Sequence, residues 1–98
     1  MNNFSDIIKN EKLTLVDFYT EWCAPCKAMI PILEELKSSA EDKVTVLKID
    51  AEKNQQISTM YQIRNVPTFF LFKNGNVLWK HSGHISLNNL KEIINQFQ

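Results

Sequence analysis

Apolar and polar positions along the chain follow patterns that change several times between the period of a strand and that of a helix. Residues 13–19 (LTLVDFY) and 44–50 (VTVLKID) are short, apolar and rich in β-branched side chains, which predicts two strands. The nearly unbroken apolar run of the first indicates burial on both faces. From Cys23 onward, apolar residues recur at steps of three and four, which predicts a helix with one buried stripe.

Two shorter segments show a helical period. Residues 5–12 are expected to form a short first helix, before the first strand. Residues 55–61 are expected to form another, with Ile57, Met60 and Tyr61 turned inward. The first half of the sequence therefore alternates between strand and helix.

The last third of the chain predicts a hairpin followed by a helix. Residues 68–72 and 77–81 are apolar and flank Asn74-Gly75, a dipeptide that supplies the positive φ angles of a type I′ turn. Ser86 is placed to cap a final helix. The apolar stripe of that helix comprises Leu87, Leu90, Ile93, Ile94 and Phe97.

The order of these elements predicts an α/β fold with a mixed sheet. Crossover helices join parallel strands at the start, the hairpin adds antiparallel strands at an edge, and helices cover both faces. A chain of 98 residues fits one domain spanning residues 1–98, and a domain of this size buries roughly 65% of its unfolded surface. That is enough for a core without cross-links.

Charge and hydropathy narrow the classes of partner. The 11 basic and 11 acidic side chains cancel, so no basic field is available to hold nucleic acid. No apolar run approaches the roughly 18 residues of a membrane span, and the first residues lack a secretion signal. We therefore expect a cytoplasmic protein that binds neither nucleic acid nor membrane.

The candidate chemistry lies in the segment EWCAPCK, residues 21–27. Cys23 falls where a strand gives way to a helix, in the first turn, where unpaired N–H groups and the helix dipole favour an anion and lower a thiol pKa. Cys26 follows one turn later on the same face, within reach of the first sulfur. Pro25 suits a first turn, because its missing N–H would be unpaired there.

Three interpretations of this pair are open from the residues alone. A static disulfide would close a ring of four residues, which constrains the unfolded chain little. Zinc would need two further ligands, and the available His81 and His84 lie far along the chain in an H-x-x-H spacing unlike that of a zinc finger. Thiol–disulfide exchange needs only the two cysteines, and we favour it.

WCAPCK after LVDFYTE, followed by VPTFFLFKNG and a late glycine, resembles the thioredoxin family over about residues 4–97. The resemblance implies a thioredoxin fold. Because the sequence starts too late to supply the first strand usual in the family, we expect a four-stranded mixed sheet flanked by about four helices.

The resemblance also implies roles for four residues. Cys23 is expected to be the exposed, attacking cysteine and Cys26 the shielded, resolving one. Asp17 is expected to be the buried acid that takes the proton of Cys26, directly or through water, with Lys48 facing it. The alternatives are a surface-facing aspartate and an ordinary solvated lysine.

The same resemblance implies a substrate groove. Pro67 is expected to follow a cis peptide bond that turns the backbone of Val66 toward an extended substrate chain. Trp22 would cover one side of the groove, unless it is a core residue, and Gly83 would permit close approach. The expected substrate-binding residues are Trp22, Ala24, Pro25, Val66, Pro67 and Gly83.

Some residues depart from the family pattern. Ala24 stands where glycine is common, and Tyr19 stands where a second tryptophan is usual. Ser82 and His84 flank Gly83 in place of small or apolar residues, which makes the expected docking surface more polar.

The function implied is that of a monomeric protein-disulfide reductase with no bound cofactor beyond the Cys23–Cys26 dithiol or disulfide. Its partners would be disulfide-containing proteins and, as electron donor, thioredoxin reductase, an NADPH-dependent flavoenzyme. Two alternatives are an oxidant or isomerase of disulfides in an exporting compartment and a non-catalytic binding module.

Overall fold

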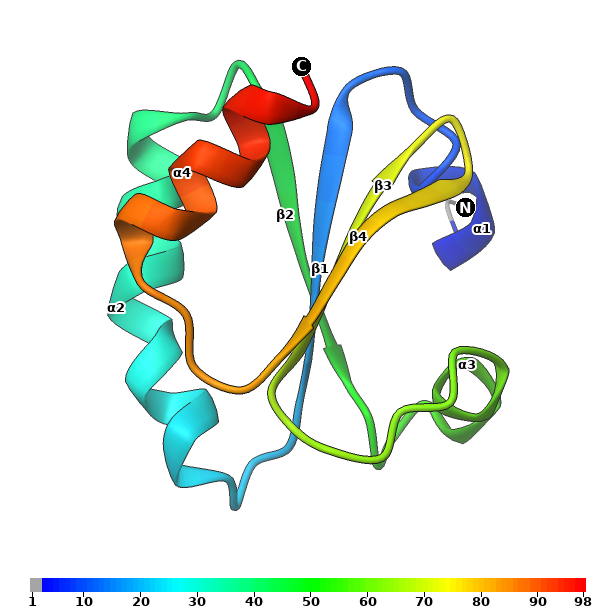
Figure 1. Cartoon of the computed structure of the whole chain (residues 1–98). Helices are drawn as coiled ribbons and strands as arrows, with labels where there is room; N and C mark the ends of the chain where they lie inside the picture. Colours follow the sequence, from blue (N-terminus) through cyan, green and yellow to red (C-terminus); the bar gives the residue numbers. More distant parts are fainter. Residues whose placement is uncertain (1–2) are drawn as a thin grey trace.

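The computed structural model describes residues 3–98 and contains four strands and four helices in the order α1-β1-α2-β2-α3-β3-β4-α4 (Figure 1). None of the helices in this part of the chain combines the length and apolar character that crossing a membrane requires. The bounds are α1 Phe4–Ile7, β1 Leu13–Tyr19, α2 Ala24–Ser39, β2 Val44–Asp50, α3 Gln55–Met60, β3 Thr68–Lys73, β4 Asn76–Ser82 and α4 Leu87–Gln96.

The strands form one mixed sheet in the order β2-β1-β3-β4. β1 pairs in parallel with β2 and antiparallel with β3, and β3 pairs antiparallel with β4. The tight turn between β3 and β4 contains Asn74 at φ 53° and Gly75 at φ 82°, the conformation that Asn-Gly favours. The predicted mixed sheet of four strands is confirmed.

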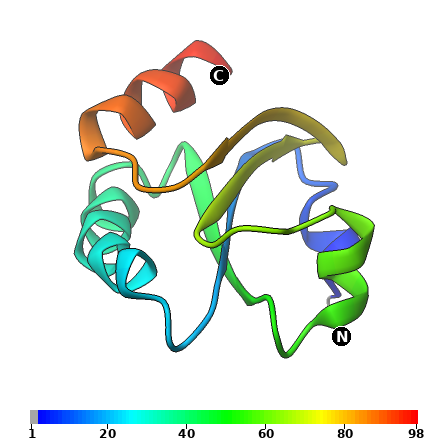
Figure 2. The same cartoon turned by 60° about the horizontal axis from the view of Figure 1, so that its bottom comes forward.

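Helices cover both faces of the sheet. In Figures 1 and 2, α2 and α4 lie on one side, and α1 and α3 lie on the other. The core is accordingly split in two, with Leu15, Met29 and Leu90 in the cluster under α2 and α4, and Phe18 and Phe72 in the other. β1 contributes to both clusters, and six of its seven residues are buried. This explains its nearly unbroken apolar run.

The first helix is shorter than predicted. The sequence predicted a helix over residues 5–12, whereas α1 ends at Ile7. The backbone that follows is held by the β3–β4 turn instead, because Gly75 N donates to Ile8 O at 2.9 Å and Asn74 N donates to Asn10 O at 3.0 Å. These tertiary hydrogen bonds compete with continuation of the helix.

The orientation predicted for Met60 is wrong. Its side chain is 65% exposed, although Ile57 and Tyr61 do pack inward. Tyr61 lies in an aromatic cluster, with its ring 5.4 Å from that of Phe70 and 5.6 Å from that of Phe72. Ile57 and Tyr61, four residues apart, form the inward side of this segment, which leaves Met60 at the edge of the stripe and turned toward solvent.

Candidate functional site

The cysteine pair lies at the start of α2, just past the end of β1. Cys23 is the N-cap residue, and its sulfur accepts a hydrogen bond from Cys26 N at 3.1 Å. Pro25 stands in the first turn of the helix, where its missing N–H costs nothing. The two cysteines form a disulfide, with their Cα atoms 5.2 Å apart. The helix start therefore holds both sulfurs together and offers a backbone donor to the first.

From the sequence we expected Cys23 to be exposed, but the structure shows it buried. Its exposed fraction is 3%, close to the 4% of Cys26, so only the prediction for Cys26 is confirmed. The N-cap position explains the difference, because the side chain of Cys23 turns back over the first helical turn, and its sulfur lies 3.6 Å from Val66 O. Cys23 nevertheless helps to line a hollow at the surface.

That hollow runs between the start of α2 and the segment before β3. On one side Trp22 is 67% exposed, so the alternative of a core tryptophan is wrong. On the other side Val66 presents its carbonyl to Cys23. The full lining is Trp22, Cys23, Ala24, Pro25, Arg64, Asn65 and Val66.

The Val66–Pro67 peptide bond is cis, as the family resemblance implied. Gly83 N donates to Pro67 O at 2.8 Å, which joins the end of β4 to this segment. Gly83 has φ 96°, a conformation that side chains disfavour, and the space a Cβ would occupy is open. Pro67 and Gly83 thus lie together, and the position of a Cβ at the glycine is open.

A buried carboxyl lies on the same side of the sheet as α2. Asp17 is 1% exposed, so the alternative of a surface aspartate is wrong. Burial raises the pKa of Asp17 to about 6, and the positive charge of Lys48 opposes this rise. Among the described residues, Asp17 Oδ1 finds no hydrogen-bond partner. At neutral pH this carboxyl can exchange a proton readily.

Lys48 lies directly opposite Asp17 in the register of β1 and β2. Lys48 is exposed, which agrees with the alternative of a solvated lysine. Its ammonium nevertheless has a partner within the protein. Lys48 Nζ lies 4.9 Å from the centre of the Tyr19 ring. The predicted proximity of Lys48 to the buried acid is therefore present, with an aromatic ring as an additional partner.

A second hollow opens beside Cys26. Its lining combines apolar surface from Tyr19 and Ile30 with the cations of Lys27 and Lys48. Ile30 is 43% exposed here. Each cysteine therefore borders a hollow of its own.

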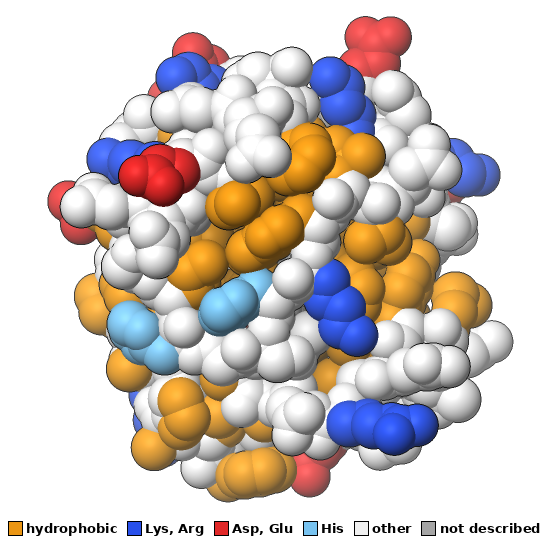
Figure 3. All heavy atoms as spheres, in the orientation of Figure 1, with side chains coloured by type: hydrophobic (Ala, Val, Ile, Leu, Met, Phe, Trp, Pro, Cys, Tyr) orange, Lys and Arg blue, Asp and Glu red, His pale blue; other side chains and the backbone are white. Residues whose placement is uncertain are grey.

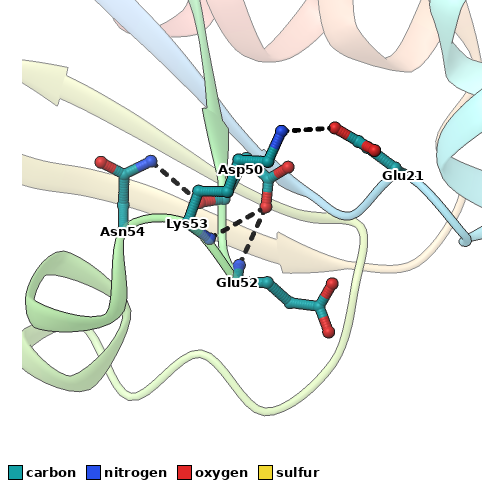
Figure 4. A network of polar contacts seen from close by, with 5 residues as sticks. All are labelled: Glu21, Asp50, Glu52, Lys53 and Asn54. Carbon is teal, nitrogen blue, oxygen red and sulfur yellow. Dashed lines mark hydrogen bonds and ion pairs between the residues drawn. The ribbon is translucent and has the colours of Figure 1, made fainter.

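A polar network braces the loop before α2 against the loop after β2 (Figure 4). Asp50 Oδ1 accepts from Glu52 N at 3.0 Å and from Lys53 N at 3.2 Å, and Asn54 Nδ2 donates to Asp50 O at 3.0 Å. Lys53 Nζ pairs with Glu21 Oε1 at 2.6 Å. The hydrogen bond to Glu21 raises the pKa of Lys53. The Lys53–Glu21 pair connects the loop that carries the exposed Trp22 to the loop after β2.

The two histidines considered as zinc ligands lie elsewhere. His81 stacks on Trp79 with ring centres 5.8 Å apart, and both histidines line a hollow between β4 and α4 that contains no cysteine. Figure 3 shows both histidines on one face of the molecule, next to hydrophobic side chains. Within residues 3–98, no group of three or more histidine, cysteine or acidic side chains is arranged to hold a metal ion.

Among the lining residues that sequence reasoning did not place are Arg64, Asn65, Lys27 and Ile30. Arg64 and Asn65 border Cys23, and Lys27 and Ile30 border the hollow beside Cys26. Their only signal was adjacency, since the first two directly precede Val66 and the others follow Cys26 in α2.

The arrangement can support thiol–disulfide exchange. It supplies two sulfurs in bonding distance, a backbone N–H directed at one of them, and a buried carboxyl able to hold or release a proton near neutral pH.

Comparison with known proteins relates the whole chain to thioredoxins. The family model described as "Thioredoxin" matches residues 1–96. Thioredoxin Y2, chloroplastic, of Arabidopsis thaliana is 44% identical over 94 residues, covering 95% of this chain and 56% of the relative. The thioredoxin of Rickettsia bellii is 42% identical over 90 residues, covering 92% of this chain and 86% of the relative. The chain thus spans little more than half the length of the plant relative.

Solved structures agree in fold. The Malassezia sympodialis thioredoxin Mala s 13 superposes with a TM-score of 0.86 at 34% identity, covering 95% of this chain and 81% of the other. Plasmodium falciparum thioredoxin gives a TM-score of 0.86 at 32% identity, covering 97% and 91%. With its matching family model, strand order and paired cysteines, this chain belongs to the thioredoxin family.

Proposed function

We propose that the protein is a thiol–disulfide oxidoreductase that reduces disulfides in other proteins. The observation that carries this proposal is the Cys23–Cys26 disulfide at the start of α2, with Cys26 N donating to the first sulfur. A backbone donor and a helix N-terminus both stabilise a thiolate, which is the reactive form of cysteine. Membership of the thioredoxin family supports the same activity.

The reaction begins with the reduced pair. The Cys23 thiolate attacks one sulfur of the substrate disulfide, whose S–S bond breaks, and the other substrate sulfur leaves as a thiolate that takes a proton from water. Asp17 accepts the proton of the Cys26 thiol, directly or through water. The Cys26 thiolate then attacks Cys23 Sγ and releases the second substrate sulfur. Two electrons have passed to the substrate, and the Cys23–Cys26 disulfide remains.

We place the substrate chain in the groove between Trp22 and the Val66–Pro67 segment. Trp22 and Val66 line the same hollow, and the position of a Cβ at Gly83 is open, which favours close approach of a substrate chain. Main-chain hydrogen bonds would give this groove broad tolerance for sequence. Ala24 and Pro25 line the same hollow.

The remaining assignments extend from the family. We propose that the protein acts as a monomeric single domain with no bound cofactor, and that thioredoxin reductase returns electrons to the Cys23–Cys26 disulfide. We propose the cytoplasm as its compartment, whereas the plant relatives are chloroplastic by name.

The test is reduction of insulin disulfides with dithiothreitol as electron source. We expect wild-type protein to accelerate precipitation of the insulin B chain and Cys23→Ser to abolish the acceleration. Reduced Cys26→Ser, mixed with insulin after dithiothreitol has been removed, should accumulate a mixed disulfide that mass spectrometry detects. Persistent activity in Cys23→Ser would contradict the proposed reaction.

Equilibration of the purified pair with a glutathione buffer tests the direction of the reaction. A potential well below that of the buffer supports a reductant, and one well above it would contradict this assignment. Full binding of substrate proteins by Cys23→Ser, combined with no reductase activity in wild-type protein, would instead identify a binding module.

A further inference from the structure

Tyr19 occupies a special position between the buried acid and the surface. It is the last residue of β1 and is half-buried. Side chains two apart on a strand project from the same face, so Tyr19 lies on the same side of the sheet as Asp17. Lys48, in register opposite Asp17, reaches over the Tyr19 ring, with its Nζ 4.9 Å from the ring centre.

We propose that Tyr19 is a positioning residue, whose ring holds the Lys48 ammonium beside Asp17 and so sets how strongly Asp17 takes up a proton. The inference deepens the proposed function and, in its consequence for catalysis, rests on it. In this role Tyr19 acts through Lys48 and Asp17 rather than on the sulfurs directly.

The contacts of Lys48 favour this role. A lysine has four rotatable carbon–carbon bonds, and the Lys48 side chain is exposed, so its charge needs a partner to occupy one place. The ion pair found within residues 3–98 joins Lys53 to Glu21 and leaves Lys48 out. An ammonium within about 6 Å of an aromatic ring is attracted by the electrons of its face. The ring is therefore the group that localises this charge.

The other charged groups around Tyr19 are already engaged or lie on the rim. Glu21 pairs with Lys53, and the Asp50 carboxylate, in register opposite Tyr19, accepts two backbone hydrogen bonds. Lys27 of α2 borders the same hollow. Lys48 is the cation whose charge opposes the rise in the pKa of Asp17.

Loss of the Tyr19 ring should therefore change the pKa of Asp17. When Lys48 is free to turn toward water, its average distance from Asp17 grows and its favourable effect on the carboxylate weakens. The pKa of Asp17 should then rise further. A ring without the hydroxyl should preserve it, because the attraction comes from the aromatic face.

The test measures the pKa of Asp17 by carboxyl ¹³C NMR in the disulfide form, without substrate. We expect Tyr19→Leu to raise it by at least about 0.3 pH unit and Tyr19→Phe to leave it within about 0.2 unit of wild type. Lys48→Met should raise it as well, and Tyr19→Leu added to Lys48→Met should have no further effect. If Tyr19→Leu fails to fold, Tyr19→Met replaces it.

An unchanged pKa in Tyr19→Leu, or in Tyr19→Met where it replaces that variant, would overturn the proposal, as would an equal shift in Tyr19→Phe or a full additional shift in the double variant. Because this titration needs no activity, its outcome is independent of whether the protein reduces disulfides. When the reduced protein, with Cys26 present, reacts with a disulfide substrate, the pH midpoint for resolution of the mixed disulfide by Cys26 should move upward with the Asp17 pKa. A midpoint that stays in place while the Asp17 pKa moves would overturn the link to exchange.

Discussion

At the scale of single residues, burial of the Asp17 carboxyl lowers the stability of the folded protein but gives the carboxyl a pKa suited to proton transfer. Its carboxyl is buried and Oδ1 lacks a partner, so the charged form is unfavourable in the folded state. Burial accordingly raises its pKa from an ordinary 3.8 to about 6. A carboxyl with this pKa can accept a proton from a thiol and release it again near neutral pH.

We predict that Asp17→Asn increases the free energy of unfolding at pH 8. The folded state holds the Asp17 proton more tightly than the unfolded state, so its stabilising effect is complete below pH 3.8 and is lost as the pH rises to about 6. The loss amounts to roughly 3 kcal/mol above that pH. Urea unfolding of the disulfide form at pH 4 and pH 8 measures it.

The matched control is Asp42→Asn, at an exposed position in the turn before β2. Wild type and this control should both lose stability between pH 4 and pH 8, and Asp17→Asn should lose much less. Equal pH dependence in all three proteins would show that the buried carboxyl does not govern this range.

At the scale of elements, Cys23 Sγ at the start of α2 both caps the helix and is the sulfur proposed to react. Cys23 Sγ accepts the hydrogen bond of an N-terminal N–H, as a serine or aspartate oxygen does at other helix starts. The same contact favours the thiolate. A substitution at Cys23 therefore changes both helix capping and reactivity, and the two can be separated by choice of residue.

We predict that Cys23→Ser is more stable than Cys23→Ala by about 1 kcal/mol. Neither variant can form the disulfide, and both lack the attacking sulfur, so the difference isolates the cap. Thermal or urea unfolding of both variants under reducing conditions measures it. Equal stability of the two would show that the sulfur contributes nothing as a cap.

At the scale of the whole molecule, stability and substrate contact are carried by different parts. The core under α2 and α4 contains fully buried side chains such as Leu90, whereas Trp22, beside the cysteines, is 67% exposed. The sheet and helices thus hold the site without depending on the surface that substrates would touch.

We predict that Leu90→Ala lowers the free energy of unfolding by about 2–5 kcal/mol while the folded fraction keeps its reductase activity. Trp22→Ala should change stability by less than about 0.5 kcal/mol, since little surface is buried there, and should raise the KM for protein substrates. Unfolding curves and insulin reduction by the two variants measure both effects. A large loss of stability in Trp22→Ala would place it in the core.

Local sequence patterns were sufficient to predict most of the helices and strands and to identify the cysteine pair. The strand over residues 13–19, the Asn74-Gly75 turn and the cap at Ser86 follow from backbone preferences and side-chain periods that neighbours in sequence determine. The spacing of Cys23 and Cys26 at a helix start follows in the same way. The cis bond at Pro67 came only from the family resemblance, since most such bonds are trans.

The amino-acid sequence by itself determined the order of strands and helices and brought two sulfurs into reach of each other, because these depend on interactions within a few residues. Only the tertiary structure decided that Cys23 is buried beside Val66, that α1 ends where the hairpin turn binds the chain, and that Lys48 lies over Tyr19. Each of these depends on contacts between segments distant in sequence, which no local period encodes.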